Sequence, residues 1–461
     1  MENYDKASIP SLADCVKVAD ETKELITDRG CYAEIPDLLK KYYQGEAVYF
    51  VADESTWEAA GKKTEEILRG AGIRIAGNLT FPAQPRLHAE YANITAIAEK
   101  LKSVSLPGGV IPIAVGGGTV NDLVKRAASE LKLTYLCVPT AASVDGYTAY
   151  GAAILYEGCK VTMECAAPLV LAADPDVLAK APAYLSSSGF GDLASKIIAG
   201  TDWIIADLAG RHGAPMAEEI ELKIWNMVQP GLLDSLNRSV DAARGDAEAV
   251  KVLFETLAVT GFSMQAMKTS RPVSGSEHLY SHIWEMEDLL VNGVPVTHGH
   301  KVAIGTLAAT AFTEIFFADP SGPPAKPAGF RRPSPSERML EVSGAFKGSR
   351  AHDLLVKIAM EKLLDDKIAS GIEEVFRENW KDIRQRVLAR LLPYGELKAL
   401  LGKALCPLRG EDIGLTRADV IATTRRAQMM RNKYTVIDLA WDTGAMEGVL
   451  AKMEESDIYL R

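Results

Sequence analysis

Residues 111–122 read IPIAVGGGTVND and decide the fold of the first part of the chain. Their five leading apolar residues predict a buried strand. Gly116, Gly117 and Gly118 follow it directly and precede a segment, 123–131, with helical spacing. A phosphate binds to exposed backbone N–H groups at a helix N-terminus, and glycine lets the backbone come close to it. The spacing is not G-x-G-x-x-G, and a tight turn has the same pattern, so both interpretations stay open.

Strand-like and helix-like segments alternate around this stretch. Residues 47–52 (AVYFVA) and 133–138 (LTYLCV) predict two further buried strands, and 57–68 predicts an amphipathic helix between the first strand and a glycine-rich stop. Strands separated by helix-length segments need crossover connections, which make them parallel. We therefore expect an α/β doubly wound parallel sheet of the nucleotide-binding type.

Helical periodicity replaces the strand pattern in the rest of the chain. Residues 191–208 show it, and so do 372–392, where Pro393 closes the predicted helix. We expect a dinucleotide-binding domain over 1–177 and an all-α domain over 178–461 that carries the metal and the substrate.

Composition limits the class of protein. The 461 residues include 51 Lys and Arg against 61 Asp and Glu, a formal net charge of −10, and 48% are hydrophobic. This apolar content excludes disorder as the dominant state, and the acidic balance argues against a nucleic-acid or membrane partner. Six scattered cysteines without a CxxC pair indicate reduced thiols in the cytoplasm, and we find neither a signal-peptide core nor an apolar run of ~20 residues.

Polar residues follow two of the predicted strands. Asp53 could accept a hydrogen bond from a ribose 2′-OH and repel a 2′-phosphate, or it could cap the next helix. The stretch 139–148 (PTAASVDGYT) could line a ligand at the carboxyl end of a strand, although its pattern alone favours a polar turn.

Four of the seven histidines fall within 23 residues, at His278, His282, His298 and His300. The S-x-x-E capping pattern at 274–277 predicts a helix start, so His278 and His282 share one helix face. His298 opens a second helix-like run. Two helix starts that each carry a histidine can point at one centre.

Asp192 is the acid that could complete this centre. It lies at the expected start of the helix over 191–208. One carboxylate and two imidazoles leave an open position on a catalytic zinc ion. The alternative role for Asp192 is an acid favoured by the helix dipole.

Five ordered motifs resemble the glycerol-1-phosphate dehydrogenases, in the superfamily of iron-dependent alcohol dehydrogenases, glycerol dehydrogenase and dehydroquinate synthase. The motifs are GGGTVND, PTAASVDGYTA, GFGDLASK, SRPVSGSEHLYSHIWEM and THGHKVAIGTL. A later stretch, RAQMMRNKYTVIDLAWDTG, resembles the longer bacterial branch that is associated with arabinose operons. The resemblance runs from about residue 20 to 445.

The resemblance implies NAD(H) or NADP(H) and one divalent metal, zinc or nickel, as cofactors, and a dehydroquinate synthase-like fold. The implied cofactor-binding residues are Asp53, Gly116, Gly117, Gly118, Thr119, Asp122, Thr140 and Ser143. The implied metal ligands are Asp192, His278 and His298. Asp145 would lie near the substrate hydroxyls, and His282 would approach the nicotinamide as a proton relay.

Three positions bear on the chemistry. Iron-dependent members carry a histidine four residues after the metal aspartate, where this chain has Lys196, which favours a three-ligand zinc-type site. Relatives often have an acid or a glutamine where this chain has His300, so its role is open. Dehydroquinate synthases use a glutamate at the position of Asp192, which favours a dehydrogenase.

The resemblance thus predicts interconversion of dihydroxyacetone phosphate and sn-glycerol 1-phosphate. The reaction needs a metal, a nicotinamide cofactor and a cationic subsite for the phosphate. Arg271 and Lys301 flank the histidine motifs and could bind the substrate phosphate, or could be surface charges. The alternatives are a glycerol dehydrogenase-like polyol dehydrogenase and a carbocycle-forming lyase related to dehydroquinate synthase. A homodimer is the family expectation.

Overall fold

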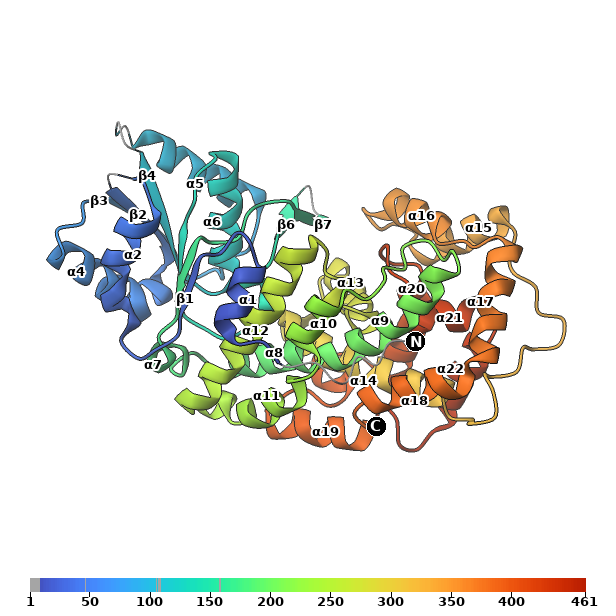
Figure 1. Ribbon diagram of the computed structural model, residues 1–461. Helices are drawn as coiled ribbons and strands as arrows, with labels where there is room; N and C mark the ends of the chain where they lie inside the picture. The colour runs from blue at the N-terminus through green and yellow to red at the C-terminus, as the bar shows by residue number, and fades with distance from the viewer. Residues whose placement is uncertain (1–8, 46, 105, 107–108, 157–158) are drawn as a thin grey trace. The chain divides into compact units, whose positions relative to one another are not determined.

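The computed structural model describes residues 9–45, 47–104, 106, 109–156 and 159–461 (Figure 1). The chain forms two compact units, which we describe separately. The sheet unit contains Asp5–Leu193 and Leu233–Thr269, and the helical unit contains Ala194–Leu232 and Ser270–Arg461. These units divide the chain later than the expected boundary after residue 177. That boundary stays a prediction about folding domains.

Six parallel strands form the centre of the sheet unit, in the order β1-β8-β5-β4-β2-β3. Their bounds are Glu24–Ile26 (β1), Ala47–Asp53 (β2), Ile75–Phe81 (β3), Val110–Gly116 (β4), Leu136–Pro139 (β5) and Val170–Ala172 (β8). A separate antiparallel hairpin joins Ala152–Tyr156 (β6) and Cys159–Met163 (β7). The predicted parallel doubly wound sheet is confirmed, with all three predicted strands in it.

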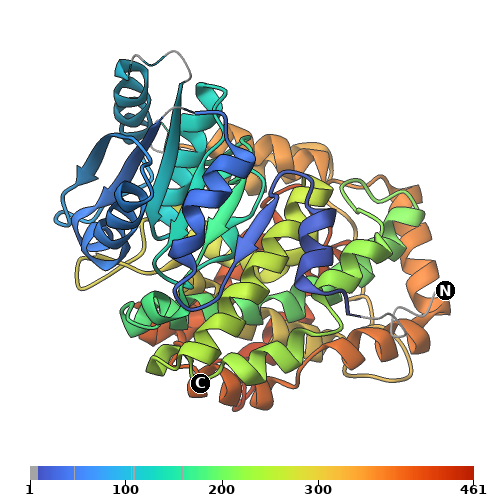
Figure 2. The ribbon, with the colours of Figure 1, turned by 60° about the vertical axis from the view of Figure 1, so that its left-hand side comes forward.

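Helices cover the sheet on both faces, as the blue and cyan part of Figure 2 shows. Alternate strand residues, among them Phe50 and Ile113, point into a core with the helices α2 (Ile35–Tyr42) and α4 (Lys62–Gly70). Helix α6 (Gly118–Glu130) packs against β4 and β2, and α5 packs against α6. Strands buried on both faces explain why the sequence shows continuous apolar runs here rather than alternation.

The remaining elements of the sheet unit are mostly helical. Their bounds are Leu12–Val18 (α1), Cys31–Glu34 (η2), Glu54–Thr56 (α3), Trp57–Gly61 (η3, a π-helical turn), Tyr91–Ser103 (α5), Asp145–Tyr147 (η4), Pro175–Leu178 (α7), Ala183–Ala194 (α8, which ends across the division), Leu232–Ser239 (α11), Ala242–Arg244 (η5) and Ala247–Met267 (α12).

The strand order places a topological switch point at the carboxyl ends of β2 and β4. The chain leaves β2 toward β3 on one side and leaves β4 toward β5 on the other, so the two connections diverge. Such a switch point is where open α/β sheets bind ligands. Val51 pairs with Ala114, and the same register continued by two residues brings Asp53 level with Gly116. Two predicted cofactor residues therefore end neighbouring strands.

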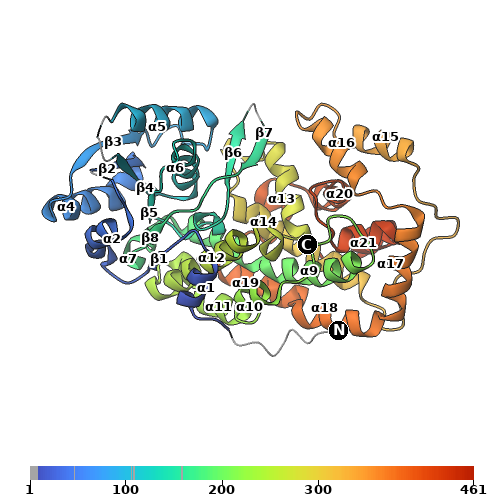
Figure 3. The same cartoon turned by 45° about the horizontal axis from the view of Figure 1, so that its top comes forward.

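The helical unit is built from long helices, with α13 and α14 packed side by side (Figure 3). Its helices are Lys196–Arg211 (α9), Leu222–Val228 (α10), Arg271–Val273 (η6), Ser276–Met286 (α13), His298–Phe316 (α14), Pro335–Ala345 (α15), His352–Glu361 (α16), Asp366–Glu378 (α17), Trp380–Arg390 (α18), Tyr394–Lys403 (α19), Gly410–Ile413 (η7), Arg417–Gln428 (α20), Val436–Asp442 (α21) and Met446–Glu455 (α22). Among the residues described, none of the helices is both long enough and apolar enough to cross a membrane.

The expected all-α character of this part needs one small correction. Leu290–Val291 (β9) and Val294–Pro295 (β10) pair as an antiparallel hairpin. Asn292 and Gly293 join them with φ of 51° and 77°. Asn-Gly is the pair that best adopts two consecutive positive φ angles, so a tight hairpin forms between two helices.

The predicted helix over 372–392 is in fact two helices. α17 ends at Glu378 and α18 begins at Trp380, because Asn379 interrupts the helix. The Asn379 side-chain amide donates to the carbonyl of Val375, 2.9 Å away, so a side chain competes with the backbone for a helical acceptor. The apolar stripe itself is buried in both helices, as predicted.

Two helix starts near the expected site also differ from the prediction. α6 begins at Gly118 rather than at residue 123, because the first N–H groups of a helix need no partner within it and glycine is tolerated there. The helix expected over 191–208 is divided at Ser195 into α8 and α9. Asp192 therefore lies in the last turn of α8, and the dipole-favoured position at a helix start was wrong.

Close packing explains why α8 contains a glycine at position 189. A Cβ atom on Gly189 would lie 2.0 Å from the carbonyl oxygen of Ala142. Glycine is present here because α8 touches the backbone of the loop after β5, and it does not mark a helix end.

Gly189→Ala is expected to lower the free energy of unfolding by about 1–3 kcal/mol, because the backbone of α8 or of the loop must move to accept the methyl group. Thermal unfolding monitored by circular dichroism measures the change. Gly344→Ala on α15 is the matched control, since nothing lies within 4 Å of the added Cβ. Equal melting temperatures for Gly189→Ala and the wild type would contradict the contact.

Candidate functional site

The three glycines after β4 have different reasons to be glycine. A Cβ on Gly116 would lie 2.7 Å from Val120, and one on Gly118 would lie 2.8 Å from Val144. Gly117 is the N-cap of α6, has an ordinary φ of −76°, and has no heavy atom nearer than 4.0 Å to an added Cβ. Two glycines thus serve internal packing, and Gly117 leaves open space at a helix N-terminus, where a pyrophosphate can bind.

The loop after β5 lies against this turn. Thr140 donates its backbone N–H to the carbonyl of Gly116, at 3.1 Å, and both Thr140 and Ser143 are buried. The Tyr147 hydroxyl donates to the carbonyl of Ala141, at 2.8 Å, which folds the loop back on itself. The predicted glycine turn and the predicted loop are therefore neighbours, and the loop is more than a polar turn.

Two buried side chains of α6 hold this loop, and the sequence analysis missed them. Lys125 is fully buried and its Nζ donates to the carbonyls of Gly146, Ala149 and Gly151, at 2.8, 2.9 and 3.1 Å. Asn121 accepts from the hydroxyl of a buried tyrosine at 2.9 Å. The available signal was a lysine and an asparagine within an apolar helix stripe, because such polar residues are buried only when fully paired.

The other cofactor predictions have mixed contacts. Asp53 caps α3, where its Oδ1 accepts the N–H of Thr56 at 2.9 Å, so the capping alternative is realised. Asp122 accepts the N–H of Ala153 at 3.3 Å, which ties it to the β6–β7 hairpin. Thr119 is partly buried in the first turn of α6. Their cofactor roles stay predictions.

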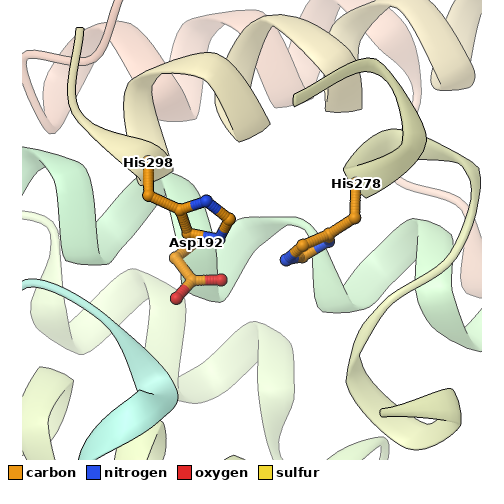
Figure 4. A group of neighbouring side chains, drawn as sticks. All are labelled: Asp192, His278 and His298. Atoms are coloured by element: carbon orange, nitrogen blue, oxygen red, sulfur yellow. The ribbon is translucent and has the colours of Figure 1, made fainter. Parts of the chain in front are cut away.

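Asp192, His278 and His298 meet, as predicted (Figure 4). One ligand atom from each lies within 4.8 Å of the others. The side chains come from the last turn of α8 and the first turns of α13 and α14. Asp192 is fully buried, and its Oδ2 accepts the N–H of Asp145 at 3.0 Å. That bond ties the cluster to the loop beside the glycine turn.

A buried carboxylate contacts the Nδ1 atom of each of the two histidines. Glu277 Oε1 lies 2.7 Å from His278 Nδ1, and Glu285 Oε1 lies 2.8 Å from His298 Nδ1. Carboxylates in this position fix the imidazole orientation and leave Nε2 to face a metal. The sequence analysis used Glu277 only as part of a capping box. The structure corrects this, because Gly275 is the N-cap and donates its N–H to Glu277 Oε1 at 2.8 Å.

Burial strongly affects the acids behind His278. It raises the pKa of Glu277 to about 7, and backbone N–H groups and the charge of Lys196 oppose the rise. It also raises the pKa of Asp202 to about 7, and the charge of Glu277 adds to it. Asp202 accepts the N–H of Ser276 at 2.6 Å and so supports the start of α13. Lys196, the residue at the iron-type histidine position, is itself fully buried.

The two remaining histidines of the cluster, His282 and His300, have lowered pKa values because they are buried. The ring centroid of His282 lies 6.2 Å from that of His278 and 6.5 Å from that of His298. Burial and the charge of Arg431 hold the pKa of His282 well below its usual value. Burial lowers the pKa of His300 to about 4, and its backbone N–H donates to Thr297, the N-cap of α14.

The two residues expected to bind the substrate phosphate, Arg271 and Lys301, differ in their contacts and in their distance from the histidine cluster. Arg271 is fully buried; its Nε donates to Glu218 at 2.6 Å and its Nη1 to the carbonyl of Tyr434 at 3.0 Å. These contacts bind Arg271 to other residues of the helical unit and do not favour binding of the substrate phosphate. Lys301 lies in the first turn of α14, with Nζ 3.5 Å from Glu285 Oε1, so it is next to the cluster.

Comparisons with known proteins show what the chain is similar to. The model of the iron-containing alcohol dehydrogenase family matches residues 26–182. An NAD(P)+ glycerol-1-phosphate dehydrogenase of Bacillus velezensis is 36% identical over 252 residues, which are 55% of this chain and 62% of the relative. That of Bacillus subtilis is 34% identical over 295 residues, 63% of this chain and 71% of the relative.

The chain belongs to the iron-containing alcohol dehydrogenase family. Its fold is also that of a glycerol dehydrogenase from Schizosaccharomyces pombe, with a TM-score of 0.55 over 95% of this chain and 94% of the other, at 15% identity. The chain spans less than two thirds of the length of the Bacillus velezensis relative. The arabinose-operon branch and the dimer stay predictions.

Asp192, His278 and His298 lie outside the stretch that the family model matches. The evidence for their grouping is therefore the distances between them in this structure. Two imidazole nitrogens and one carboxylate oxygen form the donor set of a catalytic divalent metal site, with room for a further ligand. The residues therefore fit a metal. They do not distinguish zinc from nickel.

The five cysteines whose side chains are described are buried and free. Burial raises the pKa of Cys137 and of the others with a resolved shift, so these thiols are not reactive thiolates. The side chain of Cys159 lies outside the described residues.

Lys125→Met is expected to destabilise the sheet unit by about 2–4 kcal/mol, because it leaves the buried carbonyls of Ala149 and Gly151 without this donor and removes the nearer of two donors to the carbonyl of Gly146. Thermal unfolding measures the loss, and faster amide hydrogen exchange over residues 145–151 locates it. Lys102→Met, at an exposed position of α5, is the control and is expected to behave as the wild type. Unchanged exchange in that segment would contradict the role of Lys125.

Proposed function

We propose that this protein is a metal-dependent NAD(P)H oxidoreductase that interconverts dihydroxyacetone phosphate and sn-glycerol 1-phosphate. The grouping of Asp192, His278 and His298 within 4.8 Å carries the proposal. The similarity to glycerol-1-phosphate dehydrogenases supports the choice of substrate. When bound, the metal would polarise the substrate carbonyl as a Lewis acid and the nicotinamide would supply the hydride.

Different residues of the chain are proposed to orient the metal ligands, to contact the substrate and to transfer the proton. Glu277 and Glu285 orient the two ligand histidines, so Nε2 of each can face the metal. Asp145 begins η4, next to the ligand Asp192, and is proposed to contact the substrate hydroxyls. The ring of His282 lies beside both ligand rings, which suits a group that is proposed to accept or pass a proton.

The cofactor is proposed to bind at the switch point of the sheet unit. The pyrophosphate would lie at the N-terminus of α6, against the open side of Gly117, with Thr140 and Ser143 toward the nicotinamide. Asp53 would accept from the adenosine ribose with the oxygen that is not used for capping, which favours NAD(H) over NADP(H).

Purified protein, analysed for bound metals and assayed for oxidation of NADH and NADPH, tests the proposal. Turnover of dihydroxyacetone phosphate with stoichiometric cofactor oxidation is the expected result. Turnover of free dihydroxyacetone alone would replace the proposal with a polyol dehydrogenase. Phosphate release from a sugar phosphate without net cofactor oxidation would replace it with a lyase.

His278→Ala and Asp192→Asn are each expected to reduce the tightly bound metal to well below one per chain and to lower kcat/KM by about 1000-fold or more, since each removes one of three ligands. Elemental analysis and steady-state kinetics measure the two effects. His352→Ala, a histidine paired with Asp353 near the surface, is the control. Full metal content in both ligand variants would refute the metal centre.

Gly117→Ala is expected to weaken NADH binding by about 10-fold or more while leaving the melting temperature unchanged. The added methyl group meets no protein atom within van der Waals distance and φ is ordinary, so only a ligand at the helix N-terminus would collide with it. Titration of NADH fluorescence measures affinity. Wild-type affinity in this variant would show that the pyrophosphate binds elsewhere.

A further inference from the structure

A turn of the helical unit brings another cation to the histidine cluster. Arg431 lies between α20 and α21, and its Nη2 is 3.4 Å from His282 Nε2. Because a guanidinium has N–H donors and no acceptor, Arg431 donates and His282 Nε2 accepts, while His282 Nδ1 lies 3.5 Å from Glu285 Oε2. The guanidinium therefore lies one side chain beyond the two ligand imidazoles.

Arg431 differs from the other cations around α13 in its partners. Lys433 Nζ donates to the carbonyl and hydroxyl of Ser270 and to the carbonyl of Ser274, all within 3.2 Å. Arg271 is paired with Glu218, and Lys301 lies near Glu285. In the described part of the chain, Arg431 has no carboxylate oxygen within 4.0 Å, and the imidazole of His282 is its hydrogen-bond partner.

The backbone that carries Arg431 is held firmly. Its φ is 52°, a left-handed conformation that costs about 1 kcal/mol or more for a residue with a side chain. Buried Lys362 donates to the carbonyls of Gln428 and Met430, at 2.7 and 3.2 Å, just before this residue. Lys433, two residues later, is anchored as described. The strained residue is thus fixed from both sides, which pre-organises its side chain.

We propose that Arg431 binds the phosphate group of the substrate and so sets the preference for a phosphorylated over a free triose. This inference rests on the proposed function. A planar guanidinium can donate two parallel N–H bonds to two phosphate oxygens. The charge of Glu285 acts on the Arg431 guanidinium but forms no ion pair with it within 4.0 Å, so the dianion would supply the charged hydrogen-bond partner that the described residues do not. Arg431 also takes the role that was predicted for Arg271, whose donors are engaged by protein.

Arg431→Gln in the full-length protein tests the assignment. We expect kcat/KM for dihydroxyacetone phosphate to fall by about 10- to 100-fold, mainly through KM, and the value for free dihydroxyacetone to fall by a much smaller factor, because its reaction loses only the contact of Arg431 with His282. Inorganic phosphate, as a competitive inhibitor and as the ligand in calorimetry, should bind more weakly by a similar factor. Arg431→Lys should bind phosphate with an affinity between those of the wild type and Arg431→Gln, because lysine keeps the positive charge but lacks the two parallel N–H donors of the guanidinium. Arg426→Gln, which removes a nearby cation paired with Glu287, should behave as the wild type.

Equal losses with both trioses would show a structural role and overturn the inference, as would unchanged kinetics with the phosphorylated triose. Absence of turnover of dihydroxyacetone phosphate by the wild type would instead refute the proposed function. In that case the phosphate titration decides separately: weaker binding of inorganic phosphate by Arg431→Gln supports an anion subsite, and equal binding overturns it.

Discussion

Buried carboxylates that hold two imidazoles are the interaction on which the rest of the site depends. Glu277 and Glu285 each contact the Nδ1 atom of one histidine, while Asp192 faces both. Carboxylates removed from water are costly unless a positive charge and hydrogen bonds compensate them. With one ring nitrogen of each histidine and a carboxylate oxygen of Asp192 within 4.8 Å of one another, a divalent cation is the group that satisfies this donor set best.

Close backbone contact has the same importance in the sheet unit. Gly116 and Gly118 allow the glycine turn to pack on its neighbours, Gly189 lets α8 touch the loop after β5, and Lys125 fills the space behind that loop with three hydrogen bonds. The loop in turn presents the N–H of Asp145 to Asp192. A chain of contacts within the sheet unit thus connects the glycine turn to Asp192.

Particular elements show where sequence reasoning succeeds and where it fails. Apolar runs predicted β2, β4 and β5 because strands buried on both faces need such runs. The clustering of histidines, together with the resemblance, predicted all three members of the cluster. The expected helix start at residue 191 was wrong, and Asn379 was missed as a helix break, because contacts with other segments and side-chain hydrogen bonds are not visible in the local pattern.

The sequence by itself determined the parallel α/β architecture, the helical second part and the identity of the residues able to bind a metal, since these follow from local periodicity and from the chemistry of side chains. Only the tertiary structure decided which polar groups are already satisfied. It paired Arg271 with Glu218, placed Glu285 behind His298 and turned Arg431 toward His282. Partners that lie far apart in the chain and meet through folding set the orientation and charge of each group, and no spacing in the sequence encodes that.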